Sequence, residues 1–182
     1  MNLLVAIVAA LIISLAEGRP DNWQEINYDN FSPKFVDYSP RQDFAERFSD
    51  INPWLLSVIY SFAEFHGFDI YVTSHYRDGD SGMHGIGGAI DAFFTDYTGM
   101  SRCEKLDYLF EVYILWKEFL WEMGYRPYSG LAFYLDAEHT PFLHIDIRLF
   151  VDSDGANWSR VEGNYVGVEE GLAAFREECN ED

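Results

Sequence analysis

The sequence predicts one domain built from both helices and strands. Its 182 residues suit a single domain with a buried core, and no linker or internal repeat divides them. The stretches 52–67 and 101–124 carry apolar residues at helical spacing, whereas 69–77, 89–94 and 134–148 have the patterns of strands. We expect residues 17–182 to form this domain, with a core over about 40–150 and an acidic C-terminal segment.

Two helices are expected first, after an extended lead-in over residues 17–38. Ser39-Pro40-Arg41-Gln42 is typical of a capping box with proline in the first helical position, which predicts a short helix to about Phe48. Asn52-Pro53 is a start signal for the next helix, and Gly67 is its expected end.

The middle of the chain is expected to contain two strands and the main core helix. Residues 69–77 alternate between apolar and polar side chains, which predicts a half-buried strand. A glycine-rich loop then leads into a second strand, over Ala89–Phe94. Ser101-Arg102-Cys103-Glu104 is a second capping box, and the apolar helix that it opens is expected to end at Met123-Gly124.

The segment that begins at Tyr134 ends in an alternating run, which predicts another strand. Leu143, Ile145, Ile147 and Leu149 are expected to point inward, and His144, Asp146 and Arg148 outward. Beyond Val151 the chain is rich in turn residues, and a last helix is expected at about 169–179.

The charge of the chain is strongly negative. Twelve Lys and Arg residues stand against 31 Asp and Glu residues, giving a net charge of −19. Such a chain repels phosphate backbones, so we expect no nucleic-acid partner. The acidic surface is interpreted as a solvated coat or as a contact face for a cationic partner or calcium.

The N-terminus suggests export. Residues 1–16 are mostly apolar and end in the small residues of a signal-peptidase site, although they contain no Lys or Arg. We expect a secreted or periplasmic protein, or, if this leader is not cleaved, one anchored in a membrane by it. Cys103 and Cys179 fit an oxidising compartment, but the sequence does not decide whether they pair.

Three residues form a candidate metal site. His84 and Asp91 are separated by a glycine-rich bend, and His144 lies on a later predicted strand. His84 and Asp91 are seven residues apart, and an odd separation places two side chains on opposite faces of a straight strand. The bend must therefore redirect one of them. Two imidazoles and one carboxylate are a ligand set suited to catalytic zinc.

These motifs resemble those of a known superfamily. Thr73-Ser74-His75-Tyr76-Arg77, the run His84-x-x-Gly87-x-Ala89-x-Asp91 and Leu143-His144-Ile145-Asp146 are similar to the zinc D-alanyl-D-alanine carboxypeptidases. That superfamily also contains lysostaphin-type endopeptidases and the amino-terminal signalling domain of hedgehog proteins. The resemblance covers about residues 52–150. It implies an α+β fold in which a small antiparallel sheet, packed against helices, carries Zn²⁺ on His84, Asp91 and His144.

For the enzymes, the resemblance implies hydrolysis of D-amino-acid-containing peptides of bacterial peptidoglycan, by a carboxypeptidase or an endopeptidase. The usual positions of the catalytic base hold Pro141 and Phe142 here, so we assign that role to Glu138, which matches the hedgehog-like position. His139 and Asp146 are the alternatives, and Asp146 also suits a partner of His144 or of Arg148.

Arg77 matches an arginine that binds substrate in many of these enzymes, although a simple salt bridge is the alternative. The rival to the peptidase is a catalytically inactive, hedgehog-like zinc module that acts in protein binding or structure. A lysin carried by a bacterial virus would perform the same chemistry as the peptidase.

Overall fold

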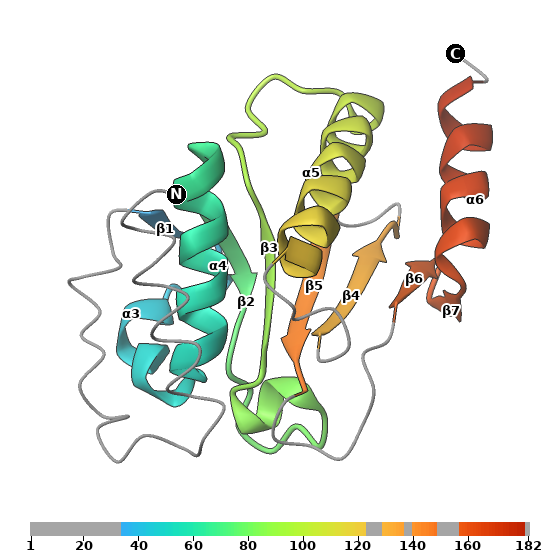
Figure 1. Ribbon diagram of the computed structural model, residues 1–182. Coiled ribbons are helices and arrows are strands. Elements are labelled where there is room, and N and C mark those ends of the chain that lie inside the picture. Colours follow the sequence, from blue (N-terminus) through green and yellow to red (C-terminus); the bar gives the residue numbers. More distant parts are fainter. Residues whose placement is uncertain (1–33, 123–128, 137–139, 149–156, 181–182) are drawn as a thin grey trace.

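The computed structural model describes residues 34–122, 129–136, 140–148 and 157–180, which form a seven-stranded mixed sheet with helices packed on it (Figure 1). The strand order across the sheet is β1-β2-β3-β5-β4-β6-β7. The strands are β1 (Phe35–Asp37), β2 (Ile70–Ser74), β3 (Ala89–Phe93), β4 (Ser129–Tyr134), β5 (Phe142–Ile147), β6 (Asn157–Val161) and β7 (Asn164–Val166). The helices are α3 (Phe44–Arg47), α4 (Pro53–His66), α5 (Arg102–Glu122) and α6 (Val168–Asn180), with 3-10 turns η3 (Phe48–Asp50) and η4 (Met83–Ile86).

The expectation of a small antiparallel sheet is wrong in size and in strand direction. The centre, β2-β3-β5-β4, is antiparallel, but β1 pairs parallel to β2, and β6 pairs parallel to β4. The added strands β1, β6 and β7 lie toward the two edges, and their short sequences lack a regular apolar alternation. Their pairing with neighbouring strands, which sequence patterns do not reveal, makes them strands.

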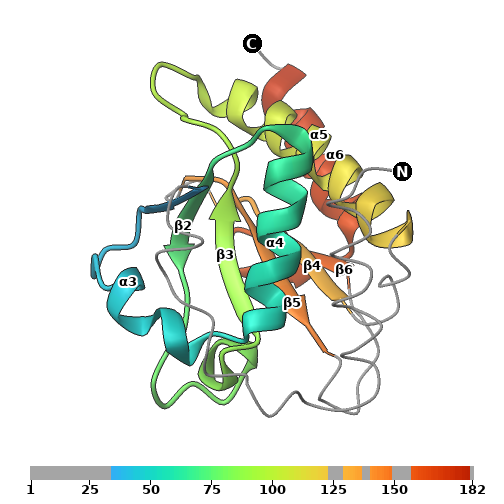
Figure 2. The same ribbon diagram turned by 60° about the vertical axis from the view of Figure 1, so that its left-hand side comes forward.

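Helices α4 and α5 pack against the sheet, and their contact forms the centre of the core (Figure 2). Phe62 of α4 meets Trp116 of α5 edge-to-face, with ring centroids 4.9 Å apart. The sheet contributes the inward side chains of its central strands to the same cluster: Ile70, Val72, Ile90, Ala92, Leu131, Phe133, Leu143 and Ile145. Side chains on the opposite face of these strands point away from α4 and α5, so a functional site can lie there.

The local signals for α4 and α5 are confirmed. The Asn52 side chain accepts hydrogen bonds from the backbone N–H groups of Trp54 and Leu55, and Gly67 ends α4 with a positive φ of 74°. At the start of α5, Ser101 and Glu104 make both hydrogen bonds of the predicted capping box. The expected apolar stripe of α5 is buried: Leu106, Leu109, Tyr113, Trp116 and Leu120. The expected end of α5 lies outside the described residues.

The capping box predicted at Ser39 is only partly present. The Ser39 hydroxyl accepts from the Gln42 backbone N–H at 3.1 Å, but Gln42 has a φ of 55° and leaves the helical path. The helix begins instead at Phe44, whose N–H donates to the Asp37 carboxylate. A tertiary contact from the end of β1 therefore replaces the local cap.

The two cysteines form a disulfide that joins α5 to α6. Cys103 lies in the first turn of α5 and Cys179 near the end of α6. Leu172 and Phe175 of α6 belong to the core, and Arg102 forms an ion pair with Glu178 beside the disulfide. The last helix predicted at about 169–179 is confirmed, and the disulfide attaches it to the body of the domain. Residues 1–16 lie outside the described residues. Among those described, none of the helices is long and apolar enough to span a membrane.

Candidate metal centre

Two of the predicted ligands face each other across the centre of the sheet. Asp91 of β3 and His144 of β5 are partners in the antiparallel ladder, so both side chains leave the same face. The distance from His144 Nδ1 to Asp91 Oδ1 is 2.8 Å. The sequence alternation on β5 correctly separated His144 from the core side chains Leu143 and Ile145, but His144 is buried rather than outward in solvent.

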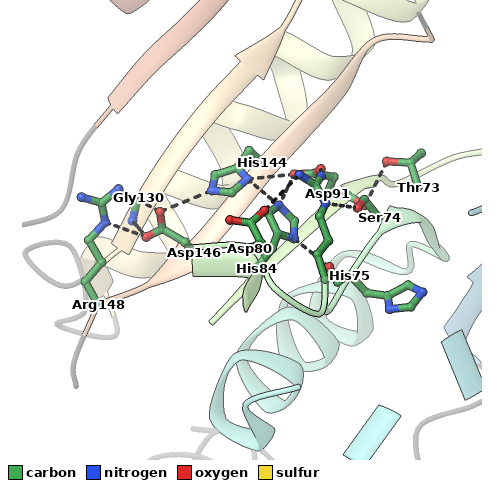
Figure 3. A network of polar contacts seen from close by, with 11 residues as sticks. Thr73, Ser74, His75, Asp80, His84, Asp91, Gly130, His144, Asp146 and Arg148 are labelled. Carbon is green, nitrogen blue, oxygen red and sulfur yellow. Dashed lines mark hydrogen bonds and ion pairs between the residues drawn. The ribbon is translucent and has the colours of Figure 1, made fainter. Parts of the chain in front are cut away.

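The third ligand, His84, comes from the 3-10 turn η4 rather than from a strand. Its Nδ1 hydrogen donates to the backbone carbonyl of His75 at 2.9 Å, which directs Nε2 toward the other two ligands (Figure 3). Gly87 closes the turn with a φ of 70°, where an added Cβ would collide with the Asp50 carbonyl. The predicted glycine-rich bend therefore does redirect His84.

The three ligand atoms are close enough to hold a metal ion. His84 Nε2 lies 3.2 Å from both Asp91 Oδ1 and His144 Nδ1, and all three residues are buried. A cluster of two imidazole nitrogens and a carboxylate oxygen fits a divalent transition metal better than calcium or magnesium, which prefer oxygen ligands.

The electrostatics of the cluster favour a cation. Burial opposes the ionised form of Asp91, but hydrogen bonds from His144 and His84 outweigh burial and hold the pKa of Asp91 below its usual value. Burial also opposes a charged His144, yet hydrogen bonds to Asp146 and Asp91 raise the pKa of His144 to about 9. Asp91 is therefore an anionic ligand at neutral pH.

Asp146 lies behind His144 and orients it. Its Oδ2 is 3.4 Å from His144 Nε2, and Arg148 holds the carboxylate with two hydrogen bonds of 2.9 Å (Figure 3). The backbone N–H of Gly130 donates to Asp146 Oδ1 at 2.7 Å, and a Cβ at this position would overlap the carboxylate. Both secondary roles predicted for Asp146, partner of His144 and ion pair with Arg148, are confirmed.

Replacing Asp146 with asparagine is expected to weaken metal binding by about 10- to 100-fold, because His144 loses the carboxylate that orients its ring. Gly130→Ala should act in the same direction, since it displaces the same carboxylate. Affinity is measured by competition with a chromophoric chelator. Asp96→Asn, which removes an exposed carboxylate elsewhere, is the control. Equal affinity of Asp146→Asn and the control would refute the orienting role.

Arg77 contacts the centre through Asp91. Its Nη2 donates to Asp91 Oδ2 at 2.8 Å, and its Nε donates to the Ser74 hydroxyl at 2.9 Å. The side chain remains 40% exposed, so N–H groups of the guanidinium are still accessible from solvent. The predicted base Glu138 and its alternative His139 lie outside the described residues.

An open cleft of about 430 Å³ reaches the metal centre at Asp91. One side is formed by residues around β1 and β2, among them Tyr38, Thr73 and Arg77. The other side is formed by Tyr134, Thr140, Phe142, Arg160 and Tyr165. Tyr134 and Phe142 belong to a strand segment predicted from the sequence, but β6 and β7, which carry Arg160 and Tyr165, are not predicted. The cleft therefore reaches the three-residue cluster through one of its members, Asp91.

Comparisons with protein-family models, curated proteins and solved structures found no match to this chain. The resemblance to the zinc carboxypeptidase superfamily therefore remains a prediction that rests on the motifs. The structure brings the three expected ligands together in a buried cluster that can hold a metal ion.

Proposed function

We propose that the protein is a zinc-dependent peptidase that hydrolyses D-amino-acid-containing peptides of bacterial peptidoglycan, as a carboxypeptidase or an endopeptidase. The observation that carries the proposal is the cluster of His84, Asp91 and His144 at an open cleft. Structural zinc sites usually have four protein ligands in a closed shell, whereas catalytic sites have three and an accessible position. The substrate class comes from the resemblance of the motifs.

A zinc ion held by these residues would supply a Lewis acid that polarises a peptide carbonyl and makes water more acidic. The chain itself then has two further tasks. Arg77, exposed next to Asp91, is suited to hold a carbonyl or carboxylate oxygen of the substrate. Glu138 is assigned to accept the proton of the attacking water and to return it to the leaving amine.

Export of the protein belongs to the same proposal. A disulfide such as Cys103–Cys179 persists in oxidising compartments, where peptidoglycan is also exposed. Together with the apolar leader, the disulfide supports a secreted, periplasmic or membrane-anchored enzyme.

The function is tested by incubating purified peptidoglycan fragments with the protein and analysing them by mass spectrometry. Each digest is compared with a chelator-treated sample and with a chelated sample to which zinc has been returned. New fragments that appear only with zinc would identify the enzyme, and their masses would identify the bond. A protein that binds one zinc ion but cleaves no peptidoglycan type would contradict the peptidase and favour the inactive zinc module.

Glu138→Gln is expected to lower turnover by at least about 10²-fold while leaving zinc content unchanged, because the amide cannot accept the proton. Turnover is measured on the fragment identified above, and zinc by atomic absorption. Glu122→Gln, at the exposed end of α5, is the control. Full turnover of Glu138→Gln would move the role of base to His139 or Asp146.

A further inference from the structure

A row of side chains leads from the metal centre to the edge of the sheet. Tyr134 of β4 is in register with Phe142 of β5 on one side and with Arg160 of β6 on the other. Arg160 is in turn in register with Tyr165 of β7, and all four residues line the cleft. Phe142, at one end of this row, is two residues from His144 on β5. A ligand at the metal centre can therefore extend along the row.

Arg160 is held firmly in this row but has hydrogen-bond donors left over. Its guanidinium lies over the ring of Tyr134, 5.6 Å from the ring centroid, and its Nη1 is 3.3 Å from Asp136 Oδ2. Its Nε is buried and has no hydrogen-bond partner within the described part of the chain. A ligand cannot reach this buried Nε, but 33% of the Arg160 side chain is exposed in the cleft, so its outer guanidinium N–H groups can donate to a bound molecule.

Arg160 and Arg77 lie on opposite sides of the ligand pair. The strand order places β2, which precedes Arg77, and β6, which carries Arg160, on either side of β3 and β5. The rest of the protein is strongly acidic, with a net charge of −19. Each guanidinium is ion-paired, Arg77 with Asp91 and Arg160 with Asp136, but both side chains line the cleft and keep N–H donors for an anionic ligand.

We propose that Arg160 determines specificity by binding a substrate carboxylate on the β6 side of the metal centre, so that the substrates are anionic peptides. This rests on the proposed peptidase function and narrows its substrate class to peptides with a free carboxylate near the scissile bond. Arginine suits this role because its planar donors match a carboxylate, and the Tyr134 ring keeps that plane in place.

The test compares matched muropeptides that carry a free carboxylate or the corresponding carboxamide. For the zinc-loaded wild type, kcat/KM is expected to be on the order of 10- to 100-fold higher for the carboxylate form, the range of a charged hydrogen bond. Arg160→Gln should abolish this preference mainly through KM, and Arg160→Lys should restore part of it. Arg176→Gln, which removes the same charge from an exposed position on α6, is the control and should keep the preference.

Failure of this proposal and failure of the proposed function give different results. Calorimetric binding of the same peptide pair is measured alongside cleavage. If nothing is cleaved, but the carboxylate form binds better and Arg160→Gln removes the difference, the peptidase fails and the anion site stands. Two results would overturn the role of Arg160. One is equal kcat/KM and equal affinity of the wild type for both peptides, and the other is an unchanged preference in Arg160→Gln protein that retains its zinc.

Discussion

Replacing His144 with alanine is expected to abolish stable zinc binding and, with it, all zinc-dependent cleavage. The described residues offer three ligands for a metal ion, so the loss of one leaves only two. Structural zinc sites with four ligands bind with roughly 10–16 kcal/mol, which is about 2.5–4 kcal/mol per ligand and on the order of 10²- to 10³-fold in affinity. His84→Ala should have the same effect, although its ring comes from a turn rather than from β5.

Zinc is measured by atomic absorption after dialysis, and cleavage by mass spectrometry on the same samples. His66→Ala is the matched control, because His66 lies at the end of α4, packed against Phe62, Phe65 and Phe68 and outside the ligand cluster. His144→Gln, which removes the imidazole but retains a polar side chain, guards against a folding defect. A well-folded His144 variant with full activity and no metal would refute the zinc peptidase.

Removing the Cys103–Cys179 disulfide is expected to lower the free energy of unfolding by about 4 kcal/mol. The bond links residues 76 apart in sequence, and closing a loop of that length restricts the unfolded chain by about this amount. The effect is large compared with the roughly 5–15 kcal/mol that stabilises a typical domain. Helix α6 should be affected most, since the disulfide attaches it to α5.

The measurement is urea unfolding of the Cys103→Ser/Cys179→Ser double variant, with reduced wild-type protein as an independent comparison. Zinc affinity under native conditions should not change, because the disulfide links two helices, whereas the candidate ligands lie on β3, β5 and the turn η4. A loss of less than about 1 kcal/mol would show that the unfolded chain is already compact in this region.

The most accurate sequence predictions concern features that depend on neighbouring residues. Asn52 and the Ser101–Glu104 box are contained within one helical turn, and both caps form as expected. The three candidate ligands, predicted from their residue types and from the spacing around the glycine-rich bend, do lie together in a cluster that can hold a metal ion. Ser39 shows the limit of this reasoning: its hydroxyl makes the expected contact, but the carboxylate of Asp37 starts the helix elsewhere.

The cleft depends on contacts between distant segments, and the sequence did not reveal it. Trp158 and Arg160 belong to a stretch with the composition of turns, and only pairing with β4 makes it a strand. The same pairing brings Arg160 beside Tyr134. Gly130 is a similar case: its lack of a side chain matters only because Asp146 occupies that space.

The sequence by itself determined the three candidate ligands, the limits of α4 and the capped start of α5. These features are encoded by side chains a few residues apart, whose geometry follows from helix and strand periodicity. Only the tertiary structure decided the size of the sheet, the partners of Asp146 and the position of Arg160 in the cleft that reaches Asp91. Each of these depends on which strands pair and in what register, and register is set by the packing of the whole core.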